Sequence, residues 1–316
     1  MRIQLIAFIS LLISLGASAQ EKPSSFSFVE IQGRNDNFQF NSNTIESYDK
    51  TKIQYYQFKP TIAPVAKLIF IHGGGVHSKL GYLQLAQTLR EEYSIETILI
   101  DLRGHGLSGG KRGDSPKVNS LYRDINEIIQ LVKRDSNLPI YLGGHSSGGG
   151  LVLNYSQWKK KENISGYIFI SPELGYKSDT EREERIPFAK VEIWKFVLNG
   201  MSCGLLMQHS DVVYFNYPQN VLDRNPLIVR SISVNMSKAL TPNNPVKQFQ
   251  NISQPVAIFV GENDELFEPK KVIKYASLPL SKDERSNTKI IPDQNHLSIL
   301  NVIGSEIGDV ILNWNK

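Results

Sequence analysis

The chain has 316 residues, a formal net charge of +4, 41% hydrophobic and 21% charged residues, and a single cysteine, Cys203. This composition is that of a globular protein and excludes disordered, collagen-like and polytopic membrane chains. The excess of 35 basic over 31 acidic residues is too small to indicate a nucleic-acid partner. One cysteine permits neither an intramolecular disulfide nor a thiolate zinc site.

The first 19 residues have the pattern of a signal peptide. Arg2 supplies a positive start, residues 5–15 form an apolar run, and Ala17-Ser18-Ala19 has the small residues of a signal-peptidase site. The run is shorter than the roughly 20 residues that span a bilayer as a helix. We therefore expect export to a periplasm or to the medium after cleavage. The alternative is an uncleaved N-terminal anchor.

Beyond a predicted hairpin at residues 44–59, turning at Asp49-Lys50, apolar strands alternate with helical patterns. This alternation predicts an α/β fold with a mainly parallel sheet of about eight strands, flanked by helices on both faces. The further predicted strands are residues 66–71, 95–102, 140–143, 167–170, 256–260 and 289–291. The predicted helices are residues 80–90, 121–132, 148–158, 269–277 and 296–314.

The alternation stops between Pro172 and Pro255. Apolar residues there recur near helical spacing, which predicts a largely helical cap inserted after the sixth strand, and insertions of this length are often lids. These residues are Phe188, Val191, Trp194, Val197 and Met201. The predicted organisation is a signal peptide (1–19), a core in two parts (20–172 and 254–316) and a cap between them (173–253).

Gly144-His145-Ser146-Ser147-Gly148 fits G-x-S-x-G and lies between a predicted strand and a predicted helix. A sharp turn there would hold Ser146 in a strained conformation with its hydroxyl above the carboxyl end of the sheet, as a nucleophile. The amide of Ser147 would point toward the same space. A second glycine motif, residues 72–75, follows a predicted strand and would let a backbone N–H approach an acyl group.

A serine nucleophile needs a base. His296 follows the last predicted strand and so lies at the same edge of the sheet as Ser146, which makes it the predicted base. The other histidines lie in glycine motifs, in loops or in the insertion (His72, His77, His105, His145 and His209). Of these, His77 is expected at the mouth of the substrate pocket.

The predicted acid is Asp264, which follows the strand before His296. Glu173, after the preceding strand, is the alternative acid. Glu265 could be a mere surface charge, and Asp101 is expected to brace the loop at residues 103–108.

These motifs resemble the α/β-hydrolase superfamily, in which a catalytic triad follows the chain order Ser, Asp, His. More narrowly, residues 72–78, 101–108 and 144–149 resemble the monoacylglycerol lipase and lysophospholipase branch, often grouped with serine aminopeptidases. Two positions depart from that branch: Val76 replaces a common glutamate, and Ser147 replaces a common methionine.

The resemblance implies a triad of Ser146, Asp264 and His296, and an oxyanion hole from the backbone N–H groups of Gly74 and Ser147. It implies no metal and no cofactor. The expected activity is hydrolysis of monoacylglycerol, lysophospholipid or related acyl esters.

The apolar cap residues could cover an acyl chain or pack the cap onto the sheet, and could make peripheral contact with lipid. The expected substrate-binding residues are His77, Trp194 and Phe215. An aminopeptidase is the alternative, with acidic residues binding a free amine (Glu173, Glu181, Glu183 or Glu184). A non-catalytic ligand-binding protein of the same fold is the second alternative.

Overall fold

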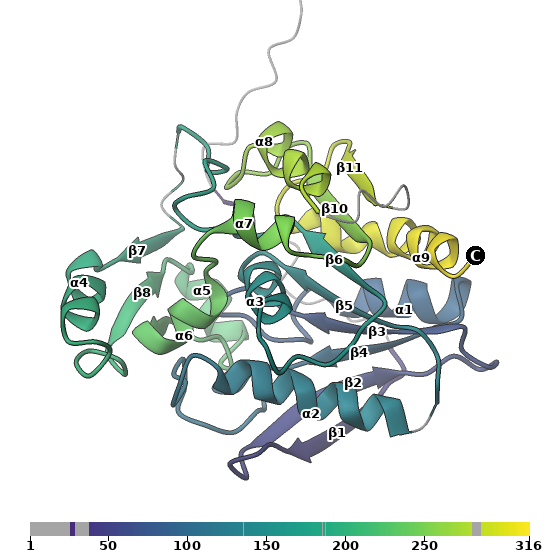
Figure 1. Cartoon of the computed structure of the whole chain (residues 1–316), viewed down its shortest axis with the longest axis horizontal. Coiled ribbons are helices and arrows are strands. Elements are labelled where there is room, and N and C mark those ends of the chain that lie inside the picture. The colour runs from purple at the N-terminus through teal and green to yellow at the C-terminus, as the bar shows by residue number, and fades with distance from the viewer. Residues whose placement is uncertain (1–25, 29–37, 135, 185, 187, 280–285) are drawn as a thin grey trace, which may run out of the picture.

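An eight-stranded sheet with helices on both faces forms the centre of the chain (Figure 1). The computed structural model describes residues 26–28, 38–134, 136–184, 186, 188–279 and 286–316. The predicted signal peptide, residues 1–19, lies outside the described residues.

The sheet is mainly parallel, as the sequence predicts. β2 runs antiparallel to its neighbours β1 and β4, and every other neighbouring pair is parallel. In order across the sheet the strands are β1 (Asn41–Glu46), β2 (Lys52–Phe58), β4 (Ile95–Ile100), β3 (Ala66–Ile71), β5 (Ile140–His145), β6 (Gly166–Ile170), β10 (Val256–Gly261) and β11 (Asn287–Ile291). The predicted hairpin turn is also confirmed, with Lys50 in the left-handed region at φ 64°.

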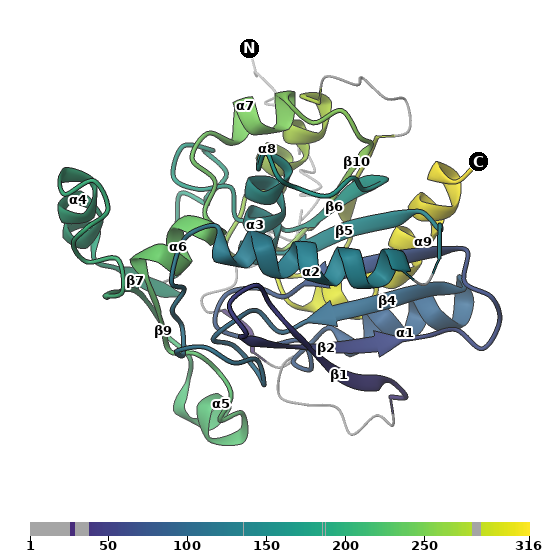
Figure 2. The same ribbon diagram turned by 60° about the horizontal axis from the view of Figure 1, so that its bottom comes forward.

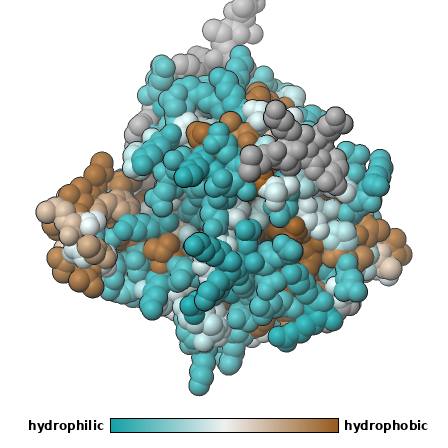
Figure 3. Space-filling view, in the orientation of Figure 1, coloured by the Kyte–Doolittle hydropathy of each residue, from teal (hydrophilic) through white to brown (hydrophobic). Residues whose placement is uncertain are grey.

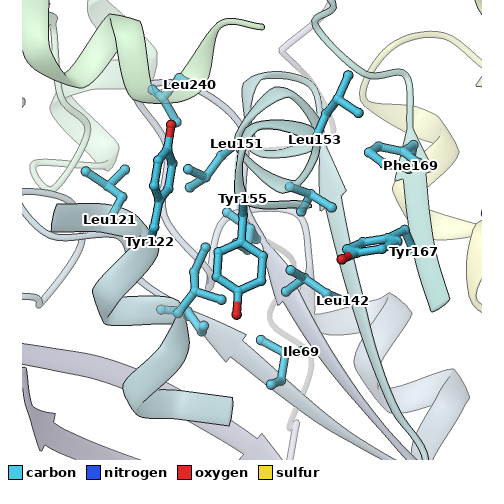
Figure 4. Close-up of a cluster of buried hydrophobic side chains, with 14 of the residues drawn as sticks. Ile69, Leu121, Tyr122, Leu142, Leu151, Leu153, Tyr155, Tyr167, Phe169 and Leu240 are labelled. Atoms are coloured by element: carbon cyan, nitrogen blue, oxygen red, sulfur yellow. The ribbon is translucent and has the colours of Figure 1, made fainter. Parts of the chain in front are cut away.

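Alternate residues of each central strand face opposite layers of helices. In β3, Ile69 and Ile71 belong to one buried cluster, and Leu68 and Phe70 to the other. Figure 4 shows part of the first cluster, where Leu151 and Tyr155 lie above the strands. The first layer contains α2 (Ser120–Arg134), α3 (Ser147–Ser156) and α8 (Pro269–Ile273), and the second α1 (Leu83–Glu92) and α9 (Ile303–Trp314) (Figures 1 and 2). Burial on both sides explains why these strands are largely apolar, and the buried exceptions Lys67 and Glu96 pair with each other at 3.5 Å.

The insertion between β6 and β10 is only partly helical. It contains a three-stranded sheet in the order β7-β8-β9, with antiparallel pairs, at the left of Figures 1 and 2. The central strand β8 reads Asp-Val-Val-Tyr-Phe, and such β-branched and aromatic residues favour strands. The elements of the insertion are β7 (Ala189–Val191), α4 (Ile193–Met201), β8 (Asp211–Phe215), α5 (Gln219–Arg224), β9 (Ser231–Ser233), α6 (Val234–Leu240) and α7 (Pro245–Gln250).

The apolar side chains of α4 face solvent instead of the sheet. Trp194 is 53% exposed, Val197 54% and Met201 78%. Figure 3 shows an apolar surface at the position of α4. Periodicity therefore indicates an amphipathic helix here, but the expected packing of this face onto the sheet is absent from the described residues.

The last predicted helix begins later than its periodicity suggests. A 3-10 turn at Ser298–Asn301 precedes α9, and another at Lys274–Ser277 follows α8. The helix starts late after residue 296 because of Asn295. Its Oδ1 accepts the backbone N–H groups of Leu297 (3.0 Å) and Ser298 (2.7 Å). This side-chain turn competes with helix and leaves His296 in the loop after β11.

Candidate active site

The candidate nucleophile, Ser146, occupies the turn between β5 and α3. Its dihedrals are φ 53° and ψ −124°, a strained conformation that costs about 1–3 kcal/mol. The residues around this turn must be small, because a Cβ atom on Gly144 would lie 2.4 Å from the carbonyl oxygen of Gly148. A Cβ atom on Gly148 would lie 2.5 Å from the carbonyl oxygen of His72. Steric crowding therefore explains why both of these positions in the motif are glycine.

Backbone hydrogen bonds hold Ser146 in this conformation. Its N–H donates to the carbonyl oxygen of Ile170 at 3.0 Å. Its own carbonyl oxygen accepts the N–H groups of Gly149 and Glu173, each at 2.9 Å. The end of β6 and the start of α3 thus stabilise the strained turn between them.

His296 and Asp264 form a buried pair at the carboxyl end of the sheet. Nδ1 of His296 donates to Oδ2 of Asp264 at 2.9 Å, and both side chains are buried. Oδ1 of Asp264 accepts the backbone N–H groups of Leu266 (3.0 Å) and Phe267 (2.9 Å). The loop after β10 therefore fixes the carboxylate, which in turn fixes the imidazole tautomer.

The contact between His296 and Asp264 shifts the pKa of each side chain, although burial opposes both shifts. Burial by itself raises the pKa of Asp264, but the charge and hydrogen bond of His296, together with Ser171 and the backbone N–H of Phe267, hold that pKa below its ordinary value. Burial by itself lowers the pKa of His296, but the charge and hydrogen bond of Asp264 raise it above its ordinary value, and Glu265 and Glu173 add to this increase. The pair therefore favours an imidazolium beside a carboxylate.

Glu265 is not a surface charge, so that interpretation was wrong. Its side chain is buried, and its Oε2 accepts the backbone N–H of His296 at 2.9 Å. Its Oε1 accepts the N–H of Ser27 at 3.3 Å. The loop after β10 turns inward, so two consecutive carboxylates contact the same histidine.

Glu173, the alternative acid, bonds elsewhere. Its Oε1 accepts the backbone N–H of Gly175 at 2.6 Å. Asp264 is the residue that contacts the His296 ring. Asp101 has the expected bracing role, because its carboxylate accepts the N–H groups of Ser78 (2.8 Å) and Leu107 (2.9 Å).

The two residues expected to donate to an oxyanion, Gly74 and Ser147, are neighbours in the structure. Gly73, Gly74 and Ser146 line one cleft, and a Cβ atom on Gly74 would lie 3.1 Å from Oγ of Ser147. Ser147 is the first residue of α3, and the first amides of a helix have no partner within it. The residue after Ser146 therefore has its backbone amide at the positive end of α3.

Sequence reasoning missed a buried network that joins the three loops of the site. The N–H of Gly73 donates to the hydroxyl of Tyr82 at 2.7 Å, and that hydroxyl lies 2.9 Å from Nδ1 of His145. Nε2 of His145 lies 3.0 Å from the carbonyl oxygen of His296. Burial holds the pKa of His145 well below its ordinary value, so the neutral ring accepts at Nδ1 and donates at Nε2.

The cleft beside Ser146 has mostly aromatic and apolar walls. The residues that line it are Phe26, Phe28, Gly73, Gly74, Val76, Tyr82, His145, Ser146, Phe188, Tyr217, His296 and Leu297.

The three residues expected to bind substrate do not belong to this lining. Phe215 packs behind the wall, with ring-centroid distances of 5.7 Å to Phe188 and 5.9 Å to Tyr217. His77 is buried outside this lining, and Trp194 is exposed on α4, so the structure places neither of them in the cleft.

The fold is that of an α/β hydrolase. Residues 62–299 match the family described as serine aminopeptidase, S33, and the chain belongs to this family. The monoglyceride lipase of Saccharomyces cerevisiae is 26% identical over 86% of this chain and 90% of its own length. The resemblance to the monoacylglycerol lipase branch is therefore confirmed.

Two further comparisons agree with the α/β-hydrolase fold. The crystal structure of a soluble variant of that yeast lipase, in complex with a substrate analog, aligns with a TM-score of 0.68 over 90% of this chain and 98% of that one, at 18% identity. An uncharacterized abhydrolase domain-containing protein of Dictyostelium discoideum is 36% identical over 42% of this chain, and that match spans 13% of its length.

Two features are absent from the described residues. The described residues contain no group of three or more His, Cys, Asp or Glu side chains that could hold a metal ion. Within the same ranges, no helix combines the length and apolarity that crossing a membrane requires.

Proposed function

We propose that this chain is a serine hydrolase that cleaves carboxylic esters through Ser146, His296 and Asp264. One observation carries the proposal: the strained Ser146 turn and the buried His296–Asp264 pair open onto a single cleft lined by Gly73 and Gly74. The names of the relatives support monoacylglycerol or related acyl esters as substrates.

The reaction is acyl transfer in two steps. His296 accepts the Ser146 proton as Oγ attacks the ester carbonyl, and Asp264 stabilises the imidazolium. The N–H groups of Gly74 and Ser147 bind the oxyanion, an interaction worth about 10²–10³ in rate for each donor. His296 then protonates the leaving alcohol, and water hydrolyses the acyl-enzyme by the same route.

The composition of the cleft favours an ester over a free amine. No acidic side chain belongs to its lining among the described residues. An aminopeptidase remains the alternative because Glu173 donates its backbone N–H to the carbonyl oxygen of Ser146 and acts electrostatically on His296. Glu183 and Glu184 are exposed.

The decisive experiment is a panel of p-nitrophenyl esters from two to sixteen carbons, with the matched Ser146→Ala variant. Turnover that disappears in the variant supports the proposal. If no ester is hydrolysed, aminoacyl p-nitroanilides test the aminopeptidase. If those also fail, and a fluorophosphonate leaves Ser146 unmodified, the non-catalytic alternative holds.

Export is part of the proposal. Cleavage after Ala19 would leave a mature chain that begins at Gln20 and retains the residues that line the cleft. Expression of the full chain in a bacterial host, with fractionation and N-terminal sequencing, tests this. Recovery of a chain beginning at Met1 in the membrane fraction would support the uncleaved anchor instead.

A further inference from the structure

The cleft beside Ser146 is nearly filled by the protein itself. Its remaining volume is about 30 Å³, and a buried water molecule needs roughly 10–15 Å³ on the same measure. Sites for drug-sized ligands are typically about 300–1,000 Å³. The space therefore fits a few non-hydrogen atoms, far fewer than a long acyl chain contains.

Two of the side chains that fill the cleft come from a short segment far away in the sequence, Phe26 to Phe28. The ring of Phe26 lies 5.8 Å from the ring of His296 and 4.7 Å from that of Phe188, centroid to centroid. The ring of Phe28 lies 5.5 Å from that of Tyr217. Phe26 is 9% exposed, so the segment forms an inner wall of the cleft.

The backbone of this segment is attached to the catalytic loop. The N–H of Ser27 donates to Oε1 of Glu265, whose other oxygen accepts the N–H of His296. The rings of Phe26 and Phe28 contact each other edge to face, with centroids 4.9 Å apart. The wall is thus held by a hydrogen bond and by a continuous cluster of aromatic rings.

We propose that Phe26 and Phe28 are specificity-determining residues that restrict the acyl group to short chains, of about two to four carbons. This inference rests on the proposed function and specifies its substrate class. A short acyl group fits the space beside Ser146 with both rings in place. A longer chain must displace the rings from Phe188 and Tyr217 and expose their apolar surface, which is unfavourable.

The test compares wild type with the Phe26→Ala/Phe28→Ala variant on the p-nitrophenyl ester panel. The matched control is Phe40→Ala, because Phe40 is also in the N-terminal part but packs on Tyr56 and Phe58 and does not line the cleft. We expect wild type and control to prefer short esters. In the double variant the ratio of kcat/KM for twelve-carbon to four-carbon esters rises at least about tenfold, since single methylenes change specificity by about 10–200-fold.

Two results would overturn the proposal: a wild-type optimum at twelve or more carbons, or an unchanged ratio in a double variant that melts cooperatively. Labelling of Ser146 by short-chain and long-chain alkyl fluorophosphonates measures access without turnover. If no ester is hydrolysed, the proposed function fails. The inference about the wall still holds if the long-to-short labelling ratio rises in the double variant, and fails if it does not.

Discussion

The backbone N–H of His296 lies 2.9 Å from Oε2 of Glu265, while its ring contacts the neighbouring residue Asp264. The two carboxylates have different effects. Asp264 fixes the tautomer and supplies the larger electrostatic effect, and Glu265 holds the backbone and adds to the increase in the pKa of His296. Their arrangement gives the activity a specific pH dependence.

We expect kcat/KM to decrease as the pH falls through the pKa of His296, with a midpoint above about 6.5. The base must be neutral to accept the Ser146 proton, and the neighbouring carboxylates stabilise its charged form. In Glu265→Gln the acid limb should move to lower pH, because a negative charge near the imidazolium is removed. Profiles of kcat/KM on a short ester measure both midpoints. An unshifted midpoint in Glu265→Gln would show that its carboxylate has only a structural role.

Asp264→Asn should lower kcat by about 10⁴ while the fold is retained, because an amide stabilises the wrong imidazole tautomer. The control is Glu173→Gln, which removes the other acidic side chain that follows a strand near His296. The control should stay within about tenfold of wild type, since Glu173 acts on the ring only at a distance. Similar losses in both variants would contradict the assignment of Asp264 as the acid. Steady-state kinetics with thermal melting of each variant separates activity from stability.

Tyr82→Phe should both destabilise the chain and slow the reaction. The Tyr82 hydroxyl bonds both Gly73 and His145, and leaving buried partners unsatisfied costs about 1–3 kcal/mol. Tyr167 offers a matched control because it is equally buried, and its hydroxyl has no hydrogen-bond partner among the described residues. Tyr167→Phe should therefore be neutral or stabilising. Urea unfolding measures the difference, and equal free energies of unfolding for the two variants would refute the role of the network.

The sequence predicts the central fold well, because the fold depends on local patterns, and the same patterns give the candidate triad. Apolar strands identify the sheet, and the carboxyl end of each strand locates Ser146, Asp264 and His296 at one edge. The wall formed by Phe26 and Phe28 could not be predicted, since no periodicity links this segment to a turn so distant in the chain. The spacing of the apolar residues in α4 likewise predicts that the helix has an apolar face, but it does not predict what contacts that face.

The exposed apolar face of α4 predicts that the chain binds lipid surfaces through the cap. Its exposed apolar residues, with those of the adjoining strand and turn, are Val191, Ile193, Trp194, Val197, Met201, Leu205 and Leu206. Such side chains gain about 1.5–3 kcal/mol each when fully buried, and basic neighbours add attraction to anionic lipid. Lys190 is the exposed basic residue next to this face in the sequence, whereas Lys195 is paired with Glu192 at 2.6 Å.

We therefore expect the protein to co-sediment with vesicles of phosphatidylcholine and phosphatidylglycerol. Trp194→Ser/Met201→Ser should reduce binding at least about tenfold, from the loss of two large apolar side chains. The control is Ile62→Ser, because Ile62 is 67% exposed but precedes β3 at the opposite end of the sheet. Hydrolysis of a soluble short ester should be unchanged in both variants, since neither site lines the cleft. Equal vesicle binding by wild type and the double variant would exclude α4 as the contact, and no binding by wild type would exclude the lipid surface itself.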